Sequence, residues 1–350
     1  MRMADRPANL GLHRFAVASA AATLLLIVAG GLVTSTESGL SVPDWPTTYG
    51  QNMFTFPPSK WVGGIRFEHT HRLIASTVGL LTIVLAIWLA RREPRPWVRR
   101  LGYAALATVV AQGLLGGLTV LLLLPTAVSV AHAYLAQTFF CLTVALAVVT
   151  SPRWRDAEPV SPGAVGSAAR ILAGAVFLQL LIGAVMRHTK AGLAIPDFPL
   201  AFGRVVPPIA SFPVAGHFAH RIGGVAVAAL ALVVLVRAGR SERPGLRKAA
   251  IAIVSLVFLQ LALGGLTVLS RKDVLVTTGH VAVSALILGT SLLLVLASRR
   301  AGAAVVAARI GRAGTNRASS AALAAEGRDM RQVRLPQTPA PTKTGREAIA

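Results

Sequence analysis

The sequence predicts an all-α membrane protein with eight transmembrane helices, arranged as two parallel four-helix-bundle repeats. Three observations lead to this fold class: long apolar runs without charge, an uneven distribution of cations between loops, and an internal repeat. Of the 350 residues, 54% are apolar and 14% are charged, whereas charged residues make up about a quarter of a soluble domain. The single cysteine excludes a disulfide framework and any multi-cysteine metal site.

Four runs contain no acidic residue, lysine or arginine and are long enough to cross a bilayer, namely 15–36, 101–152, 249–270 and 274–298. The long run 101–152 must hold two helices, divided near Pro125. Three shorter runs reach spanning length by extending across a flanking histidine or arginine. None of the runs alternates as the strands of a membrane barrel would. The expected helices are 15–36, 67–90, 100–121, 129–150, 168–187, 217–236, 248–269 and 275–297.

The positive charge indicates an orientation rather than a nucleic-acid partner. The net charge of +22 is typical of proteins that bind nucleic acid. With eight spans, however, 26 of the 35 cations fall on the side of the two termini and 7 fall on the other side. Cytoplasmic loops carry such an excess of lysine and arginine. We therefore expect both termini in the cytoplasm, a bilayer around the helices and no nucleic-acid partner.

An internal repeat divides the chain into two halves. Segment 38–46 recurs as 191–199, His71-Arg72 as His220-Arg221, segment 112–120 as 260–268, and His132 as His280. The offsets stay between 148 and 153 residues. Because each half holds an even number of helices, the halves have the same orientation in the membrane.

The expected organisation follows from the spans and the repeat. It comprises a cytoplasmic N-terminus (1–14), a first four-helix half (15–150), a cytoplasmic linker (151–167), a second half (168–297) and a basic, disordered cytoplasmic tail (298–350).

Four of the eight histidines occupy matched positions in the two halves: His71, His132, His220 and His280. All four lie near the extracytoplasmic ends of their spans, where ionisable residues are costly and usually functional. Two imidazoles from neighbouring helices are typical axial ligands of haem iron, and a helical bundle supplies the apolar slot. The pattern therefore predicts one haem site in each half, with hydrogen bonding between helices as the alternative.

The repeat breaks at one position near these histidines. Glu68 aligns with His217, and each lies three residues before a candidate ligand. A carboxylate in one half alone indicates that the first half does chemistry, while the second holds an electron-transfer cofactor. Arg72 and Arg221 follow the ligands and are candidate contacts to haem propionates, with snorkelling to water as the alternative.

These motifs together resemble the haem A synthase family. They comprise Glu68-x-x-His71-Arg72, the segment 36–45, His220-Arg221 and the duplicated halves. The resemblance implies oxidation of the C8 methyl group of haem O to a formyl group, giving haem A for terminal oxidases. It also implies that His71 and His132 hold the substrate haem with Glu68 catalytic, and that His220 and His280 ligate a haem b cofactor.

Some bacterial members of that family carry a cysteine pair in the first outer loop. Residues 37–66 contain no cysteine, so the chain resembles the cysteine-free branch. Haem O synthase and terminal oxidase assembly factors are candidate partners on the same resemblance, and a bacterial-type cytoplasmic membrane is the implied location.

Two other functions compete with this one. A non-enzymatic two-haem b-type cytochrome that passes electrons from quinol explains four histidines equally well. It does not explain why only one half has Glu68, and it favours haems at two depths. A transporter would also have parallel repeats, but it predicts helices interrupted at the midplane of the membrane.

Overall fold

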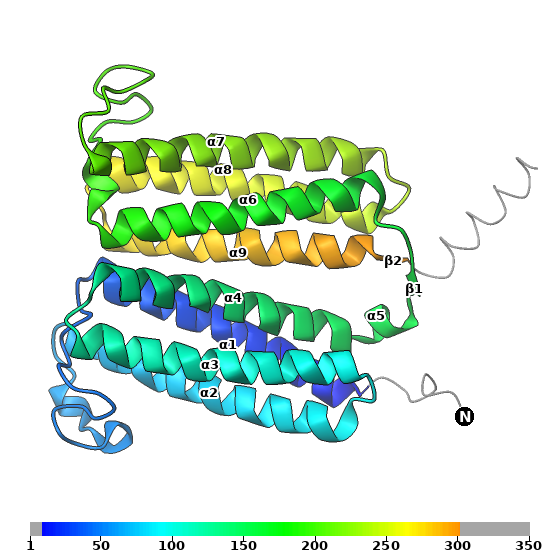
Figure 1. Cartoon of the computed structure of the whole chain (residues 1–350), viewed down its shortest axis with the longest axis horizontal. Coiled ribbons are helices and arrows are strands. Elements are labelled where there is room, and N and C mark those ends of the chain that lie inside the picture. Colours follow the sequence, from blue (N-terminus) through cyan, green and yellow to red (C-terminus); the bar gives the residue numbers. More distant parts are fainter. Residues whose placement is uncertain (1–8, 302–350) are drawn as a thin grey trace, which may run out of the picture. The chain divides into compact units, whose positions relative to one another are not determined.

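The computed structural model describes residues 9–301, and the chain outside this range is not discussed further. The described chain is almost entirely helical (Figure 1), and eight of its helices are long and apolar enough to cross a membrane, as predicted. These helices are α1 (Leu10–Ser35), α2 (Ile65–Arg92), α3 (Pro96–Leu121), α4 (Thr126–Thr150), α6 (Gly163–His188), α7 (Phe212–Gly239), α8 (Pro244–Leu269) and α9 (Val274–Ser298).

The helices begin one to five residues before the positions expected from the apolar runs. The added residues include prolines, glycines and polar side chains as well as apolar ones. Pro96 and Pro244 occupy the first positions of α3 and α8, where a missing N–H costs nothing. Asn9 caps α1 by accepting the N–H of Leu12. The apolar stretch therefore marks the part of each helix that lies in lipid rather than the whole helix.

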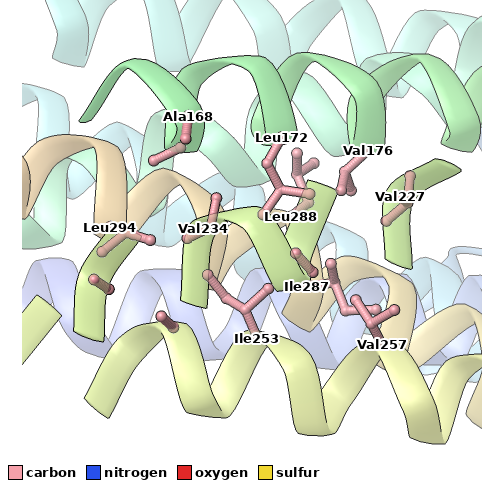
Figure 2. Packing of buried hydrophobic residues seen from close by; sticks show 14 of the residues in the cluster. Ala168, Leu172, Val176, Val227, Val234, Ile253, Val257, Ile287, Leu288 and Leu294 are labelled. Atoms are coloured by element: carbon pink, nitrogen blue, oxygen red, sulfur yellow. The ribbon is translucent and has the colours of Figure 1, made fainter. Parts of the chain in front are cut away.

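Each half forms a closed four-helix bundle. In the first half α1 contacts α2, α2 contacts α3, α3 contacts α4, and α4 returns to α1; α6 to α9 repeat this order. The core of the second half is aliphatic, and Figure 2 shows Leu172, Ile253 and Leu288 meeting between its helices. Large apolar side chains such as Leu80 and Leu178 are exposed on the outside, as expected for surfaces that face lipid.

The two bundles join along α1, α4, α6 and α9. Phe140 of α4 packs against Gly289 of α9, where a side chain would lie 3.0 Å from the ring. Polar groups also cross this interface: Arg187 of α6 donates hydrogen bonds to the carbonyl of Gly31 (2.9 Å) and to Oγ of Ser35 (3.0 Å) on α1. The joint is therefore both apolar and hydrogen-bonded.

The connections between helices lie at two opposite ends of the bundles (Figure 1). The long loops 36–64 and 189–211 share one end, which we name the outer end, and contain the short helices η1 (Met53–Thr55), η2 (Pro58–Lys60) and η3 (Ala191–Leu193). The linker expected at 151–167 lies at the other end. It forms α5 (Pro152–Asp156) and β1 (Glu158–Pro159), and β1 pairs with β2 (Arg300–Ala301). Of the tail predicted from residue 298, everything beyond Ala301 lies outside the described residues.

Candidate functional site

The four repeated histidines lie on four different helices, two in each bundle. His71 and His132 lie on α2 and α4, and His220 and His280 on α7 and α9. Each lies about two turns inside its helix, counted from the outer end, which is deeper than the expected start of each helix placed it. The ring centroids of His220 and His280 are 6.3 Å apart. His132 is also close enough to His71 for an electrostatic interaction.

Each of these imidazoles packs against a glycine of the preceding helix. A methyl group added to the glycine would lie 3.0–3.2 Å from Cε1 of the facing ring. The four pairs are Gly30 with His71, Gly116 with His132, Gly183 with His220, and Gly264 with His280. A larger residue at any of these positions would force the ring to shift by a few tenths of an ångström, because a Cβ atom at 3.0–3.2 Å is closer than ordinary van der Waals contact. The glycines therefore position the rings.

Three of the four histidines also contact a glutamine that lies one turn before the glycine. Nε2 of Gln179 lies 3.0 Å from Nδ1 of His220 and donates to its carbonyl oxygen at 2.7 Å. Gln112 and Gln260 approach Nε2 of His132 and His280 at 3.4 and 3.1 Å. Gln179, Gly183 and Gly30 were not among the residues predicted from the sequence. The recurring spacing Gln-x-x-x-Gly at 112–116, 179–183 and 260–264 was the signal that would have identified the first two.

These groups contain several buried polar atoms without a protein partner. Among the described residues, Nδ1 of His71, His132 and His280 and Oε1 of all three glutamines make no hydrogen bond. A histidine that ligates a metal through one nitrogen usually donates its other N–H to an oxygen acceptor. Rotation of the Gln260 amide would offer Oε1 as that acceptor. For Gln112 and Gln179 the same rotation would give up the hydrogen bond from Nε2 to the carbonyl oxygen of the histidine. The unpartnered atoms therefore fit imidazoles that bind a metal.

The spacing of the second pair fits a metal held between two rings. A metal–imidazole bond is about 2 Å long and a ring nitrogen lies about 1 Å from the ring centroid, so two opposed ligands have centroids roughly 6 Å apart. The measured 6.3 Å between His220 and His280 agrees with this value. The donor set and the glycine-lined packing thus fit a bis-histidine haem.

The two outer loops end in equivalent aromatic turns over the bundles. Asp44 accepts the N–H groups of Tyr49 (2.7 Å) and Gly50 (2.9 Å), and Asp197 accepts those of Phe202 (2.7 Å) and Gly203 (2.8 Å). Both aspartates therefore stabilise the turns that follow them. The N–H groups of Gly203 and Phe202 lower the pKa of Asp197 below its ordinary value, because they stabilise the ionised carboxylate.

The aromatic residue after each aspartate packs on a glycine of the neighbouring helix. A methyl group at Gly117 of α3 would lie 2.6 Å from the ring of Trp45, and one at Gly265 of α8 would lie 2.7 Å from that of Phe198. The glycine before each of these, Gly116 or Gly264, packs against the histidine of the next helix. Each pair of adjacent glycines therefore gives space to two different rings, a histidine ring and an aromatic ring of the outer loop.

Replacing Gly117 by alanine is expected to lower stability, because the new methyl group would overlap the Trp45 ring. Overpacking of this kind costs about 1–3 kcal/mol. Gly113, one turn earlier on α3, has nothing within 4 Å of its added methyl group and provides the control. Gly113→Ala should be neutral or slightly stabilising, since glycine in a helix interior costs about 0.5–1 kcal/mol. Thermal unfolding in detergent measures both, and equal midpoints would contradict this packing.

Glu68 and Arg72 hold the first outer loop onto α2. Oε1 of Glu68 accepts a hydrogen bond from Nη2 of Arg72 at 2.7 Å, and Oε2 accepts the N–H of Val42 at 2.8 Å. Arg72 also donates to the carbonyl oxygens of Val42, Asp44 and Thr47 at 2.7–3.0 Å. Both side chains are buried. The pair therefore satisfies loop groups that would otherwise lie unpaired near the membrane.

The second half repeats this arrangement with histidine in place of glutamate. His217 accepts the N–H of Ile195 through Nδ1 at 3.2 Å. Arg221 donates to the carbonyl oxygens of Ile195, Asp197 and Leu200 at 2.6–3.2 Å. These partners are the repeat equivalents of those in the first loop. The two arginines thus anchor the loops, a role that the sequence analysis did not assign to them, and their contact with propionates stays a prediction.

The remaining histidines have structural contacts. His69 is fully buried beneath the first loop, where it lies 3.3 Å from Oγ1 of Thr48 and packs edge-on against Trp61. His69 therefore packs against the first outer loop. Nδ1 of His13 lies 3.0 Å from the carbonyl oxygen of Ala147 and so links α1 to α4.

Comparison with known proteins assigns the chain to a family. The model of the COX15-CtaA family, described as cytochrome oxidase assembly protein, matches residues 13–62 and 65–292. A heme A synthase of Symbiobacterium thermophilum is 32% identical over 286 residues, which cover 77% of this chain and 89% of the relative. Those of Halalkalibacterium halodurans (31%; 76% and 90% covered) and Caulobacter vibrioides (30%; 82% and 95% covered) are similar over comparable lengths. Because the family model extends across both bundles and all four histidines, the chain belongs to the COX15-CtaA family of cytochrome oxidase assembly proteins.

Proposed function

We propose that the chain is a haem A synthase, a membrane oxidoreductase that converts the C8 methyl group of haem O to a formyl group. The observation that carries this proposal is the pairing of four histidines in two equivalent bundles, of which only the first contains a buried carboxylate one turn from a ligand. The relatives named heme A synthase support the same activity.

The first half is the proposed substrate site. His71 and His132 would ligate the iron of haem O, with their rings held against Gly30 and Gly116. Oxidation of a methyl to a formyl group adds one oxygen atom and removes two hydrogen atoms, so protons must leave the site. Glu68 is the proposed group that accepts or passes them, because it is the carboxylate nearest to His71 on α2.

The second half is the proposed cofactor site. His220 and His280 would hold a haem b, which when bound supplies electron transfer to or from the first half. The protein's own contribution there is positional: Gly183, Gly264, Gln179 and Gln260 fix the two rings. Arg72 and Arg221 are proposed to contact haem propionates near the outer end, in addition to the loops that they anchor.

The location follows from the same features. The eight apolar helices make the chain a multi-pass membrane protein. We propose that the bundle end near α5, where α1 begins and α9 ends, faces the cytoplasm of a bacterial-type membrane, since most of the cations lie on that side. Haem O synthase and terminal oxidase assembly factors are the proposed partners, because one supplies the substrate and the others use the product.

Haem extraction after expression together with a haem O source tests the activity. The expected result is haem A in the extract from the full-length chain, and haem O without haem A in the extract from the same host with an empty vector. An extract that contains haem b but no haem A would contradict the enzyme and favour the electron-transfer cytochrome. That alternative has no use for the buried carboxylate of Glu68.

A further inference from the structure

One of the four imidazoles lacks the partner that the other three have. Gln179 of α6 contacts His220, and it lies four residues before Gly183. In the first half, the residue four before Gly30 is Leu26, at the same offset of 153. Leucine can neither donate nor accept a hydrogen bond. Nδ1 of His71 is buried without a partner in the described part of the chain, as are Nδ1 of His132 and His280, but those two rings have a glutamine at Nε2.

A second position differs between the halves together with the first. Gly223 lies three residues after His220, and a methyl group added there would overlap Oε1 of Gln179. The equivalent position in the first half, three residues after His71, is Ile74. The glutamine thus needs the glycine for its space. At the matched positions of the first half, Leu26 and Ile74 are both apolar and both pack against the core of that bundle.

The chemistry of histidine ligands gives this difference a consequence. An imidazole bound to a metal through one nitrogen is oriented, and made more basic, by an acceptor for its other N–H. Loss of such an acceptor typically lowers metal affinity 10–100-fold. Oε1 of Gln179 is buried and unpartnered beside His220. Rotation of the amide would bring Oε1 to Nδ1 of His220 as an acceptor, in exchange for the hydrogen bond that Nε2 now donates to the carbonyl oxygen of His220. His71 has no such group.

Resting on the function proposed above, we infer that Gln179 is a positioning residue that makes His220 a permanent axial ligand, whereas His71 is the ligand that can leave the substrate iron. Its departure would open a coordination position on the side of α2, where Glu68 lies one turn away. A bis-histidine iron has no free position, so the substrate site needs a ligand that detaches, and the electron-transfer site needs two that do not.

Binding of carbon monoxide to the reduced protein measures this difference, because it requires an axial ligand to leave a six-coordinate iron. The second half is studied in a full-length His71→Ala/His132→Ala background, purified with its resident haem. Gln179→Leu is expected to raise the rate of carbon monoxide binding about 10–100-fold. Gly223→Ala should act in the same direction by displacing the glutamine, which itself stays in the chain.

Gly224→Ala is the matched control. It makes the same change at the next residue of α7, where the added methyl group comes no closer than 3.5 Å to Leu261. Its rate should equal that of the unaltered protein. Equal rates for the alanine variants at 223 and 224, with haem retained in both, would overturn the inference, because a glutamine that merely packs helices affects stability without affecting ligand exchange.

If the second-half variants lose their haem, the same inference can be tested in the first half by introducing the glutamine and the glycine there. Leu26→Gln with Ile74→Gly places the second-half pair beside His71. In a His220→Ala/His280→Ala background reconstituted with haem O, this variant should bind carbon monoxide about tenfold more slowly. An unchanged rate would overturn the inference.

The ligand assignment has its own readout. In the His71→Ala/His132→Ala background, His220→Ala should remove the six-coordinate spectrum. If the spectrum persists, the assignment of His220 as a haem ligand is wrong. If His220→Ala removes the spectrum while Gln179→Leu changes nothing, only the inference about Gln179 fails.

Discussion

Replacing His280 with alanine is expected to abolish the six-coordinate b-type spectrum of the purified protein. One ring of the pair at 6.3 Å is then missing, and no other histidine of the described chain forms part of that pair. His220→Ala should have the same effect. The absorbance spectrum of the reduced protein, with the haem content per chain, measures the change when the host supplies no haem O.

His13→Gln is the control for this change. His13 lies at the opposite end of the first bundle, and glutamine retains a donor for the carbonyl oxygen of Ala147. The variant should keep its full haem content and spectrum. An unchanged spectrum in both His280→Ala and His220→Ala would mean that the haem is bound elsewhere, and the function assigned to the second half would have to be abandoned.

Glu68→His is expected to lower haem A formation by a factor of about 10²–10⁴, the usual contribution of a general acid or base. The substitution introduces histidine, the residue type that the second half has at the equivalent position, His217. His217 accepts the loop N–H of Ile195 there, so a histidine at 68 can accept that of Val42. The loop should stay in place while the carboxylate is lost. Haem A yield in a host without its own enzyme measures the effect.

The design separates proton transfer from loop anchoring. Thermal unfolding should show nearly equal midpoints for Glu68→His and the unaltered chain, since Arg221 holds its loop without a carboxylate. His217→Glu, the reciprocal exchange, should leave haem A formation near its original level. Normal yield from Glu68→His would show that Glu68 serves only to hold the loop, and its catalytic assignment would fall.

The membrane architecture was predictable because each span is a long apolar run and the repeat preserves order and spacing. The four histidines followed from the same repeat, since matched residues on matched helices occupy equivalent places. The glycines facing His71 and His220 were not predicted. Gly30 of α1 and Gly183 of α6 occupy matched positions, but the residues on either side of them differ between the two halves. They therefore do not stand out as part of a repeated segment.

The anchoring of the outer loops could not be predicted for a different reason. Arg72 and Arg221 bind carbonyl oxygens of the loop backbone, and every residue type carries such an oxygen. The residue types at Val42 and Ile195 therefore do not identify these positions as partners of Arg72 and Arg221. The positive charges of Arg72 and Arg221 near the outer end could be predicted from the sequence. Which carbonyl oxygens accept their hydrogen bonds depends on the path of each loop, which only the folded chain defines.

The packing of each histidine against the helix before it also bears on how the protein is made. Every histidine–glycine pair belongs to one hairpin, α1–α2, α3–α4, α6–α7 or α8–α9, and membrane proteins are inserted from the N-terminus onward. Each hairpin can thus complete its own half of a ligand pair as soon as it enters the bilayer. Haem would then bind between two hairpins that have already folded, so that haem binding becomes the last step of assembly of each bundle.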